Sequence, residues 1–187
     1  MRRSSCEDSK VMMASAADPD QFGVIFDRHF DAIYRYMARR TSGDAAALTS
    51  ETFCVAFSRR SSFDARALSA LPWLYGIARN VIGNAQRSTY RLQRATSRLA
   101  LERSADVSVE TLTFDDSAQL DHLDAALAAS LSRLADDDRE ALLLMVWEGL
   151  TYAQIASVTG VPVGTVRSRI HRARHQVRTS LEGNRHE

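Results

Sequence analysis

Apolar residues recur at helical spacing along almost the whole chain, and no stretch alternates apolar and polar residues as a half-buried strand does. The first helix is expected in "QFGVIFDRHFDAIYRYMARR", with an apolar stripe of Phe22, Phe26, Phe30, Ile33 and Met37. "TSGD" then breaks the chain, and Asp44 is expected to cap a second helix that reaches roughly residue 59. Pro72 opens a third helix, whose apolar residues at helical spacing are Leu74, Ile77, Ala78, Val81, Ile82 and Ala85.

A second group of helices is expected from about residue 120, over 120–134 and 137–148, with Asp137 and Glu140 as a capping pair. In "LTYAQIASVTGV", Thr151 and Gln154 have the spacing of a capping box, and Gly160 can adopt the left-handed conformation that ends a helix. The whole pattern predicts an all-α chain with two small helical domains joined by a flexible acidic linker. The expected divisions are a disordered tail at 1–17, a domain at 18–100, the linker at 101–119 and a second domain at 120–187.

The segment "PVGTVRSRIHRAR" contains four arginines, one histidine and no acid. Its apolar stripe is Val166, Ile170, Ala173 and Val177, and the residues that follow each of these are Arg167, His171, Arg174 and Arg178. A solvated basic face is the ordinary explanation of such a helix. The short helix and glycine turn before it instead favour a helix-turn-helix, whose second helix enters the major groove of DNA.

Charge is distributed unevenly along the chain, although the formal net charge is only +1. Residues 79–103 contain six arginines and one acid, and residues 161–178 contain five arginines and no acid. Between them, residues 104–124 contain six acids and no basic residue. Two basic zones separated by an acidic connector indicate two DNA-facing modules on a tether.

Several classes of function find no support in the sequence. Cys6 and Cys54 lie in different settings and form no disulfide framework, which fits a reducing cytoplasm. No signal peptide or membrane-spanning stretch is present, so a soluble, cytoplasmic protein is expected. There is no P-loop or catalytic triad, and the five histidines are scattered without metal-ligand spacing. We therefore expect no cofactor, no metal and no enzymatic activity.

Three motifs resemble a known family. "YAQIASVTGVPVGTVRSRIHRAR" is similar to the carboxy-terminal promoter-reading module of bacterial sigma factors of the extracytoplasmic-function (ECF) group, within the sigma-70 family. "SETFCVAFSRRSSFD" and "PWLYGIARNVIGNAQR" are similar to the amino-terminal module of the same group. The resemblance implies a subunit that binds core RNA polymerase, directs it to promoters and assists DNA melting.

The resemblance also implies roles for particular residues. Residues implied to bind the minus-35 element are Thr165, Arg167, Ser168, Arg169, His171, Arg172 and Arg174. Residues implied to bind the minus-10 element are Phe63, Trp73, Ile77, Arg79, Asn80, Asn84, Arg87 and Arg91. In this group, Asn80, Ile77 and the loop around Phe63 would hold a base flipped from the non-template strand, and the arginines would hold phosphates. Trp73 is a candidate stacking partner, but an aromatic residue at a helix start more often packs in the core.

The implied partners are promoter DNA, an anti-sigma factor and core RNA polymerase, through the clamp coiled coil of its largest subunit and the flap of the second largest. Residues implied to bind the clamp are Asp44, Leu48, Glu51, Thr52 and Phe53. Ala46 and Ala47 stand where the family usually has more acid, so docking would depend more on Asp44, Glu51 and apolar contacts. For Phe53, packing in the core is the competing interpretation.

Two other classes of function explain the sequence less well than a sigma factor does. An ordinary helix-turn-helix regulator would be expected to carry a dimerisation seam, and the chain has no sustained heptads. A helical enzyme acting on nucleic acid lacks any catalytic constellation in this sequence. The acidic connector is either a solvated tether or, as the resemblance implies for such linkers, a peptide that occupies the RNA path of the polymerase.

Overall fold

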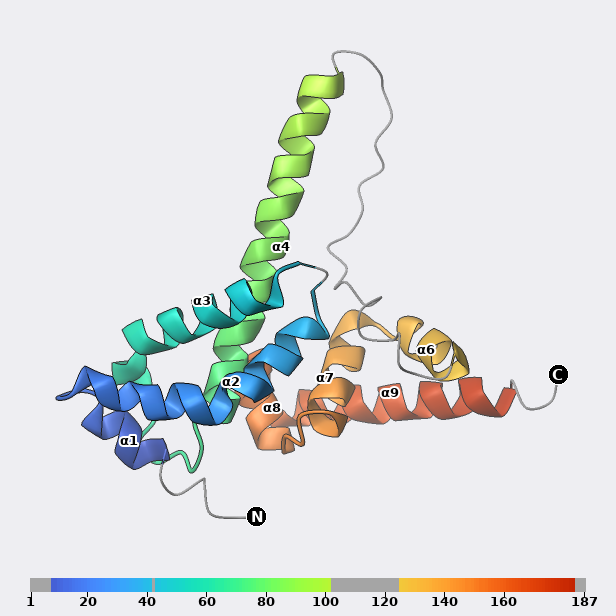
Figure 1. Cartoon of the computed structure of the whole chain (residues 1–187). Helices are drawn as coiled ribbons and strands as arrows, with labels where there is room; N and C mark the ends of the chain where they lie inside the picture. Colours follow the sequence, from blue (N-terminus) through green and yellow to red (C-terminus); the bar gives the residue numbers. More distant parts are fainter. Residues whose placement is uncertain (1–7, 42, 102–124, 184–187) are drawn as a thin grey trace.

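The structure is a computed structural model that describes residues 8–41, 43–101 and 125–183. Throughout these residues the regular elements are helices, which confirms the expected all-α class with two helical domains (Figure 1). The acidic linker predicted at 101–119 lies, from residue 102 onward, outside the described residues. The same holds for the first residues of the helix predicted at 120–134.

The amino-terminal domain contains α1 (Asp8–Ala14), α2 (Phe22–Ala38), α3 (Ala45–Ser58) and α4 (Leu71–Leu101). Two short 3-10 turns, η1 (Pro19–Gln21) and η2 (Arg60–Ser62), precede α2 and follow α3. The backbone amide of Ala47 donates to Asp44 Oδ1 over 2.9 Å, so Asp44 caps α3 as the sequence predicts. The long α4 extends well beyond the other helices of its domain (Figure 1).

Helix α1 differs from the expectation of a disordered tail over residues 1–17. Asp8, Met12 and Ser15 are buried, and α1 packs against α2. The sequence signal is weak here because α1 is only seven residues long. Its stability comes from contacts with residues far along the chain, which periodicity does not report.

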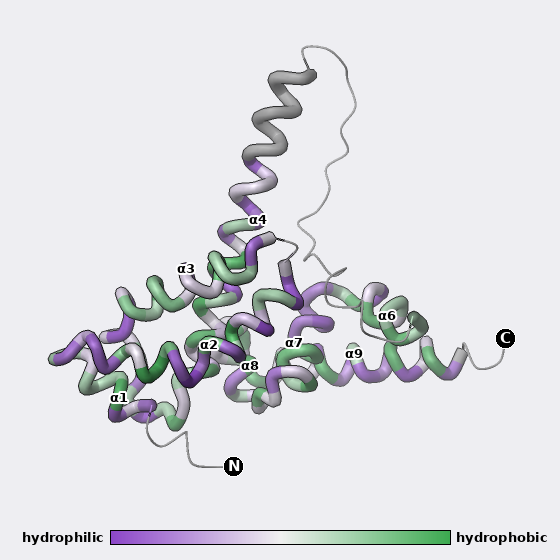
Figure 2. Tube along the Cα trace, in the orientation of Figure 1, coloured by the Kyte–Doolittle hydropathy of each residue, from purple (hydrophilic) through white to green (hydrophobic). Residues whose placement is uncertain are grey.

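The apolar stripe predicted for α2 is correct only in part. Ile33 and Met37 are fully buried, but Phe26 is 37% exposed, and Ile25 and Tyr36 are fully buried in its place. The reason is that α1, α3 and α4 all pack against α2, so its buried face is broader than a single stripe. Figure 2 shows apolar positions (green) interspersed with hydrophilic ones (purple) along these helices.

The carboxy-terminal domain contains α6 (Ala125–Ser132), α7 (Asp136–Val146), α8 (Tyr152–Thr159) and α9 (Val163–Gly183). Thr151 and Gln154 form the predicted capping box, and Gly160 ends α8 with a φ of +71°. The predicted capping pair of Asp137 and Glu140 is wrong. Helix α7 begins at Asp136 without a side-chain cap, and the Glu140 carboxylate instead binds Arg79 of α4.

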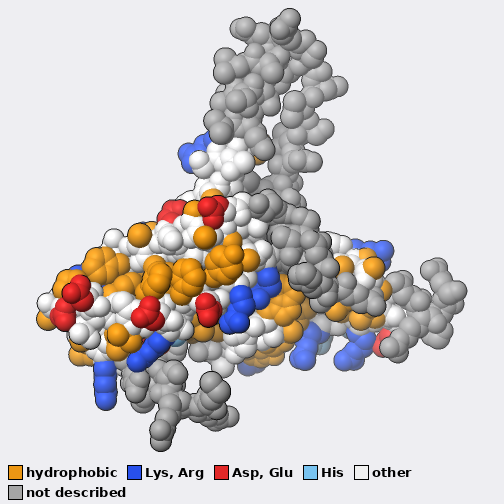
Figure 3. Space-filling model, in the orientation of Figure 1, with side chains coloured by type: hydrophobic (Ala, Val, Ile, Leu, Met, Phe, Trp, Pro, Cys, Tyr) orange, Lys and Arg blue, Asp and Glu red, His pale blue; other side chains and the backbone are white. Residues whose placement is uncertain are grey.

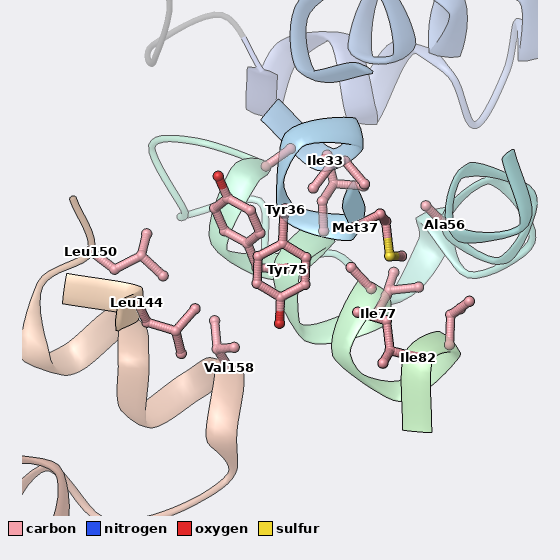
Figure 4. Close-up of a cluster of buried hydrophobic side chains, with 14 of the residues drawn as sticks. Ile33, Tyr36, Met37, Ala56, Tyr75, Ile77, Ile82, Leu144, Leu150 and Val158 are labelled. Carbon is pink, nitrogen blue, oxygen red and sulfur yellow. The ribbon is translucent and has the colours of Figure 1, made fainter. Parts of the chain in front are cut away.

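The two domains pack against each other through α4 and α8 and share one hydrophobic core. Figure 4 shows Tyr36 and Tyr75 of the first domain lying between Ile33 and Met37 on one side and Leu144, Leu150 and Val158 of the second domain on the other. The rings of Tyr36 and Tyr75 are 5.0 Å apart, centroid to centroid. The described residues therefore form one continuous body made of two halves, each built from consecutive helices of the chain.

Candidate nucleic-acid interface

The outer face of α9 is the most basic exposed helix surface of the carboxy-terminal domain. Val166, Ile170 and Ala173 are buried, which leaves the opposite side of α9 in solvent. Of the predicted minus-35 residues, Arg167, Ser168, His171, Arg172 and Arg174 are exposed, and Thr165 and Arg169 are half-buried. A shallow hollow of about 370 Å³ beside the helix is lined by Tyr152, Arg167, Ile170, His171, Arg174, His175 and Arg178. Such a hollow with several cationic side chains suits a phosphate-bearing ligand.

Two of the predicted arginines are paired within the domain. Arg172 donates from Nε and Nη2 to the two carboxylate oxygens of Asp138, over 2.9 and 2.7 Å, and Arg169 donates to Asp137. Asp138 is nearly buried, whereas Arg172 remains exposed. The hydrogen bond to Asp138 raises the pKa of Arg172 above its usual value. The pairing fixes the guanidinium of Arg172 along the surface between α7 and α9.

A second group of predicted residues lies around the start of α4. Phe63 follows η2, and its ring meets that of Trp73 edge to face, with the centroids 5.6 Å apart. Both rings are half-buried. Ile77, one turn after Trp73 in α4, is buried, and Asn80, about one turn after Ile77, is exposed. The structure thus brings an aromatic pair and an exposed amide to the same end of one helix.

The remaining predicted minus-10 residues follow along α4. Asn84 accepts a hydrogen bond from Arg87 Nη2 over 2.6 Å, and Arg91 donates to the Arg87 carbonyl, so these three lie together on an exposed surface. Arg79 differs from them because its Nε donates to both oxygens of Glu140, over 2.9 and 3.1 Å. Burial alone would lower the pKa of Arg79, but the attraction of Glu140 outweighs it and the pKa is raised.

The residues predicted to bind polymerase do not share one environment. Asp44 and Glu51 are exposed and Leu48 is half-buried, but Thr52 and Phe53 are buried. The Phe53 ring lies 4.8 Å from that of Phe26, and Thr52 Oγ1 donates to the Leu48 carbonyl. The interpretation of Phe53 as a core residue therefore agrees with its packing.

Sequence reasoning missed an exposed aromatic surface on α2. Phe26 is 37% and Tyr34 is 41% exposed, and Phe30 lies between them with ring-centroid distances of 5.1 and 6.1 Å. Figure 3 shows hydrophobic side chains gathered in a band over α2 and α3. Phe26 belongs to the predicted apolar stripe and Tyr34 follows Ile33 in the chain, so the sequence contains these residues but does not indicate their exposure. Contiguous exposed apolar side chains are typical of interaction surfaces, so this face is a candidate for one.

Among the described residues, no group of three or more His, Cys, Asp or Glu side chains has the arrangement of a metal site. His122 and His186 lie outside that part of the chain. Within the same residues, no helix is both long enough and apolar enough to cross a membrane. Cys54 is exposed on α3 as a free thiol.

Comparison with protein families gives two matches in one chain. Residues 25–92 match the family described as sigma-70 region 2, and residues 124–177 match the family described as sigma-70, region 4. The first match covers α3 and most of α2 and α4, and the second covers α6 to α8 and most of α9. Helix α1 precedes both.

Individual relatives agree with the family matches. The ECF RNA polymerase sigma factor BldN of Streptomyces coelicolor is 33% identical over 185 residues, which cover 92% of this chain and 66% of BldN. The probable RNA polymerase sigma-C factor of Mycobacterium bovis is 36% identical over 151 residues, which cover 80% of this chain and 77% of the relative.

Solved structures share the fold at lower identity. The structure of CnrH in complex with the cytosolic domain of CnrY has a TM-score of 0.60 and 24% identity, and covers 94% of this chain and 97% of CnrH. The sigma factor RpoE in complex with the anti-sigma factor NepR from Bartonella quintana has a TM-score of 0.55 and 24% identity, and covers 86% of this chain and 96% of that one. At this identity the likeness is one of fold.

Proposed function

Because the chain belongs to the ECF group of the sigma-70 family, we propose that it directs core RNA polymerase to promoters and helps to open the DNA there. The observation that carries this proposal is the presence of region 2 and region 4 in one chain, each with a basic or aromatic surface suited to DNA. The protein would supply recognition and strand separation, while the polymerase supplies the chemistry of RNA synthesis.

The minus-35 element is assigned to α9. Its exposed face offers Arg167, Ser168, His171 and Arg174 in the part of a helix-turn-helix that enters the major groove, with Thr165 at its start. Arginine bound to guanine through two hydrogen bonds is the commonest specific contact in that groove. Arg169 and Arg172 can join these contacts by exchanging their acidic partners in α7 for DNA.

The minus-10 element is assigned to the start of α4 and the loop before it. A base flipped out of the duplex loses its stacking, and an aromatic surface restores roughly 1–3 kcal/mol per base. Phe63 and Trp73 provide such a surface, and the exposed Asn80 amide can both donate to and accept from a base edge. Arg87 and Arg91 are exposed further along α4, where they can neutralise phosphates.

The face formed by α2 and α3 is assigned to the clamp of the largest polymerase subunit. Its exposed aromatic side chains, Phe26 and Tyr34, are joined by the exposed acids Asp44 and Glu51 and by half-buried Leu48. An apolar surface with acids at its edge suits a coiled coil that carries basic residues. Region 4 would contact the flap of the second-largest subunit.

An anti-sigma factor is the third proposed partner. The CnrH structure contains CnrY, and the RpoE structure contains the anti-sigma factor NepR, so proteins with this fold form such complexes. Polymerase and promoter both place the working protein in the cytoplasm. A free chain should bind duplex promoter DNA weakly, because its net charge is +1 and affinity for DNA depends on the number of phosphates neutralised.

The proposal is tested by mixing the purified protein with core polymerase and mapping transcripts from a library of promoter sequences. We expect stable association with core polymerase and transcripts that depend on minus-35 and minus-10 sequence. Asn80→Ala should alter the preference at one minus-10 position, whereas Gln176→Ala, which removes an exposed amide from α9, should leave that preference unchanged. Tight sequence-specific footprints by the free protein, without polymerase association, would instead identify a conventional helix-turn-helix regulator.

A further inference from the structure

Helix α1 and Ser15, the residue that follows it, contact the two ends of the segment that joins α3 to α4. This helix precedes residues 25–92, so it lies outside the residues that match sigma-70 region 2. The segment, residues 60–70, contains Phe63, the aromatic residue assigned to the flipped minus-10 base. The contacts of α1 therefore bear on a part of the molecule that reads DNA, provided that the proposed function holds.

The carboxylate of Asp8 fixes the downstream end of this segment. Asp8 is 1% exposed, and its Oδ2 accepts hydrogen bonds from the Ala70 amide over 3.0 Å and from Ser69 Oγ over 3.3 Å. On the other side, Arg28 Nη1 of α2 donates to Oδ1 over 3.1 Å, and His29 Nε2 lies 2.8 Å from Oδ2. One buried carboxylate thus joins α1, α2 and the residues immediately before α4.

The carbonyl of Ser15 fixes the upstream end. Arg60 Nε donates to this carbonyl over 3.1 Å, and Arg60 Nη1 donates to the Phe57 carbonyl over 2.8 Å. The Arg60 guanidinium also lies 4.3 Å from the centre of the Phe57 ring. The side chain of Ser15 is itself held by the Met12 carbonyl over 2.7 Å, and Met12 is buried. The end of α1 and the start of the segment are therefore linked through Arg60.

Between these two ends, Phe63 packs against Trp73 of α4, and the remaining contacts are local. Asp64 and Arg66 pair with each other on the surface, and Leu68 is 68% exposed. A loop anchored at both ends samples fewer conformations, so less entropy is lost when it closes on a ligand. A base pocket needs its walls within a fraction of an ångström of the right place to discriminate well.

We propose that α1 positions the segment 60–70 through Asp8 and Ser15, and that Asp8 is thereby a positioning residue for minus-10 base selection. The charge of Asp8 suits this role. Burial alone would raise the pKa of Asp8, but hydrogen bonds from His29 and the Ala70 amide, with the charge of His29, outweigh it and lower the pKa to about 2. All four groups around the carboxylate can donate to it, so an amide in its place would offer one acceptor oxygen and an NH₂ facing donors.

The test uses holoenzymes assembled from core polymerase and either the wild-type chain or one variant. Open-complex formation is measured on promoters that differ at one minus-10 base, and the ratio between preferred and substituted base is compared. Asp8→Asn should reduce this ratio by a factor of about five at one position, which corresponds to about 1 kcal/mol of discrimination. The corresponding minus-35 ratio and the affinity for core polymerase should stay unchanged. Asp20→Asn, which neutralises an exposed acid of η1, is the matched control.

A second variant separates positioning from folding. Arg60→Met keeps an unbranched apolar stem over Phe57 but removes the donor to Ser15, and it should reduce the same minus-10 ratio as Asp8→Asn. If Asp8→Asn does not fold, the minus-10 ratio of Arg60→Met tests the positioning role on its own. Variants that melt at lower temperature but keep the wild-type base preference would overturn the positioning role. A wild-type holoenzyme without any promoter preference would contradict the proposed function itself, which is a different result.

Discussion

The guanidinium of Arg172 has two competing partners, the Asp138 carboxylate that it binds in this structure and the DNA that the resemblance assigns to it. Arg172→Ala should weaken binding to promoters that carry a minus-35 element by about 1–3 kcal/mol if a base contact is lost. Asp138→Asn should strengthen it, because a neutral amide holds the guanidinium less tightly and leaves it available to DNA. Opposite signs for the two variants therefore indicate a DNA contact.

The measurement is a titration of holoenzyme on promoters with and without the minus-35 element. Arg133→Ala removes an exposed arginine of the same domain and controls for the general loss of positive charge. If Arg172 only braces α9 against α7, both substitutions break the same brace and binding falls in both. That result would exclude Arg172 from minus-35 readout.

The turn between α8 and α9 depends on the backbone of Gly160, whose φ is +71°. A Cβ there would have no atom within 4 Å, so Gly160→Ala adds backbone strain without a steric clash. The left-handed region costs an L-residue about 1–2 kcal/mol, and the melting temperature should fall by a few degrees. Gly164→Ala is the matched control, because Gly164 lies within α9 with equal space around it. It should stabilise the protein slightly, since alanine favours helix, and a loss of stability equal to that of Gly160→Ala would refute the argument.

At the level of elements, the sequence predicts those features, such as helix caps and exposed faces, that depend on residues close together in the chain. The caps at Asp44, Thr151 and Gly160 depend on residues a few positions away. The arginines of α9 lie on its exposed side because the helical period places them opposite or beside the buried apolar stripe. Contacts between distant residues leave no such signal. Arg172 pairs with a residue 34 positions away and Arg79 with one 61 positions away.

The same distinction explains the errors at α1 and α2. Helix α1 is too short to stand out by periodicity, and Asp8 looks like a surface acid until Arg28, His29 and Ala70 surround it. The buried face of α2 is set by three neighbouring helices, so Phe26 becomes exposed although it belongs to the apolar stripe. Roles on DNA and polymerase came from the resemblance, because no local pattern distinguishes a base-binding Asn80 from any exposed amide.

At the scale of the whole molecule, the two halves are joined by buried charges as well as by the shared core. Glu148, which follows α7, has a side chain 4% exposed and accepts hydrogen bonds from Arg39 Nη2 over 2.5 Å and from Tyr75 Oη over 2.8 Å. Its Oε1 is also 3.5 Å from Arg40 Nη1, and burial together with Glu148 raises the pKa of Tyr75. Arg79 crosses the same interface to Glu140, so phosphate binding by Arg79 would compete with contact between the halves.

Some buried polar atoms at this interface have no hydrogen-bond partner among the described residues. These atoms are Tyr36 Oη, Arg39 Nε and Arg40 Nη2. A buried polar group left unpaired costs about 1–3 kcal/mol. The contact between the halves therefore depends strongly on the charges that are paired, and Glu148 is the acid that pairs with both Arg39 and Arg40.

Glu148→Gln should separate the two halves without unfolding either one. The substitution leaves the buried Arg40 and the half-buried Arg39 without a counter-charge, and breaking a fully buried pair in this way costs about 3–5 kcal/mol. We expect the single cooperative melting transition of the wild-type chain to split into two and the radius of gyration from small-angle scattering to increase. Glu182→Gln, which neutralises an exposed acid near the end of α9, should change neither. A Glu148→Gln variant that keeps one transition and the wild-type radius would show that the shared core alone holds the halves together.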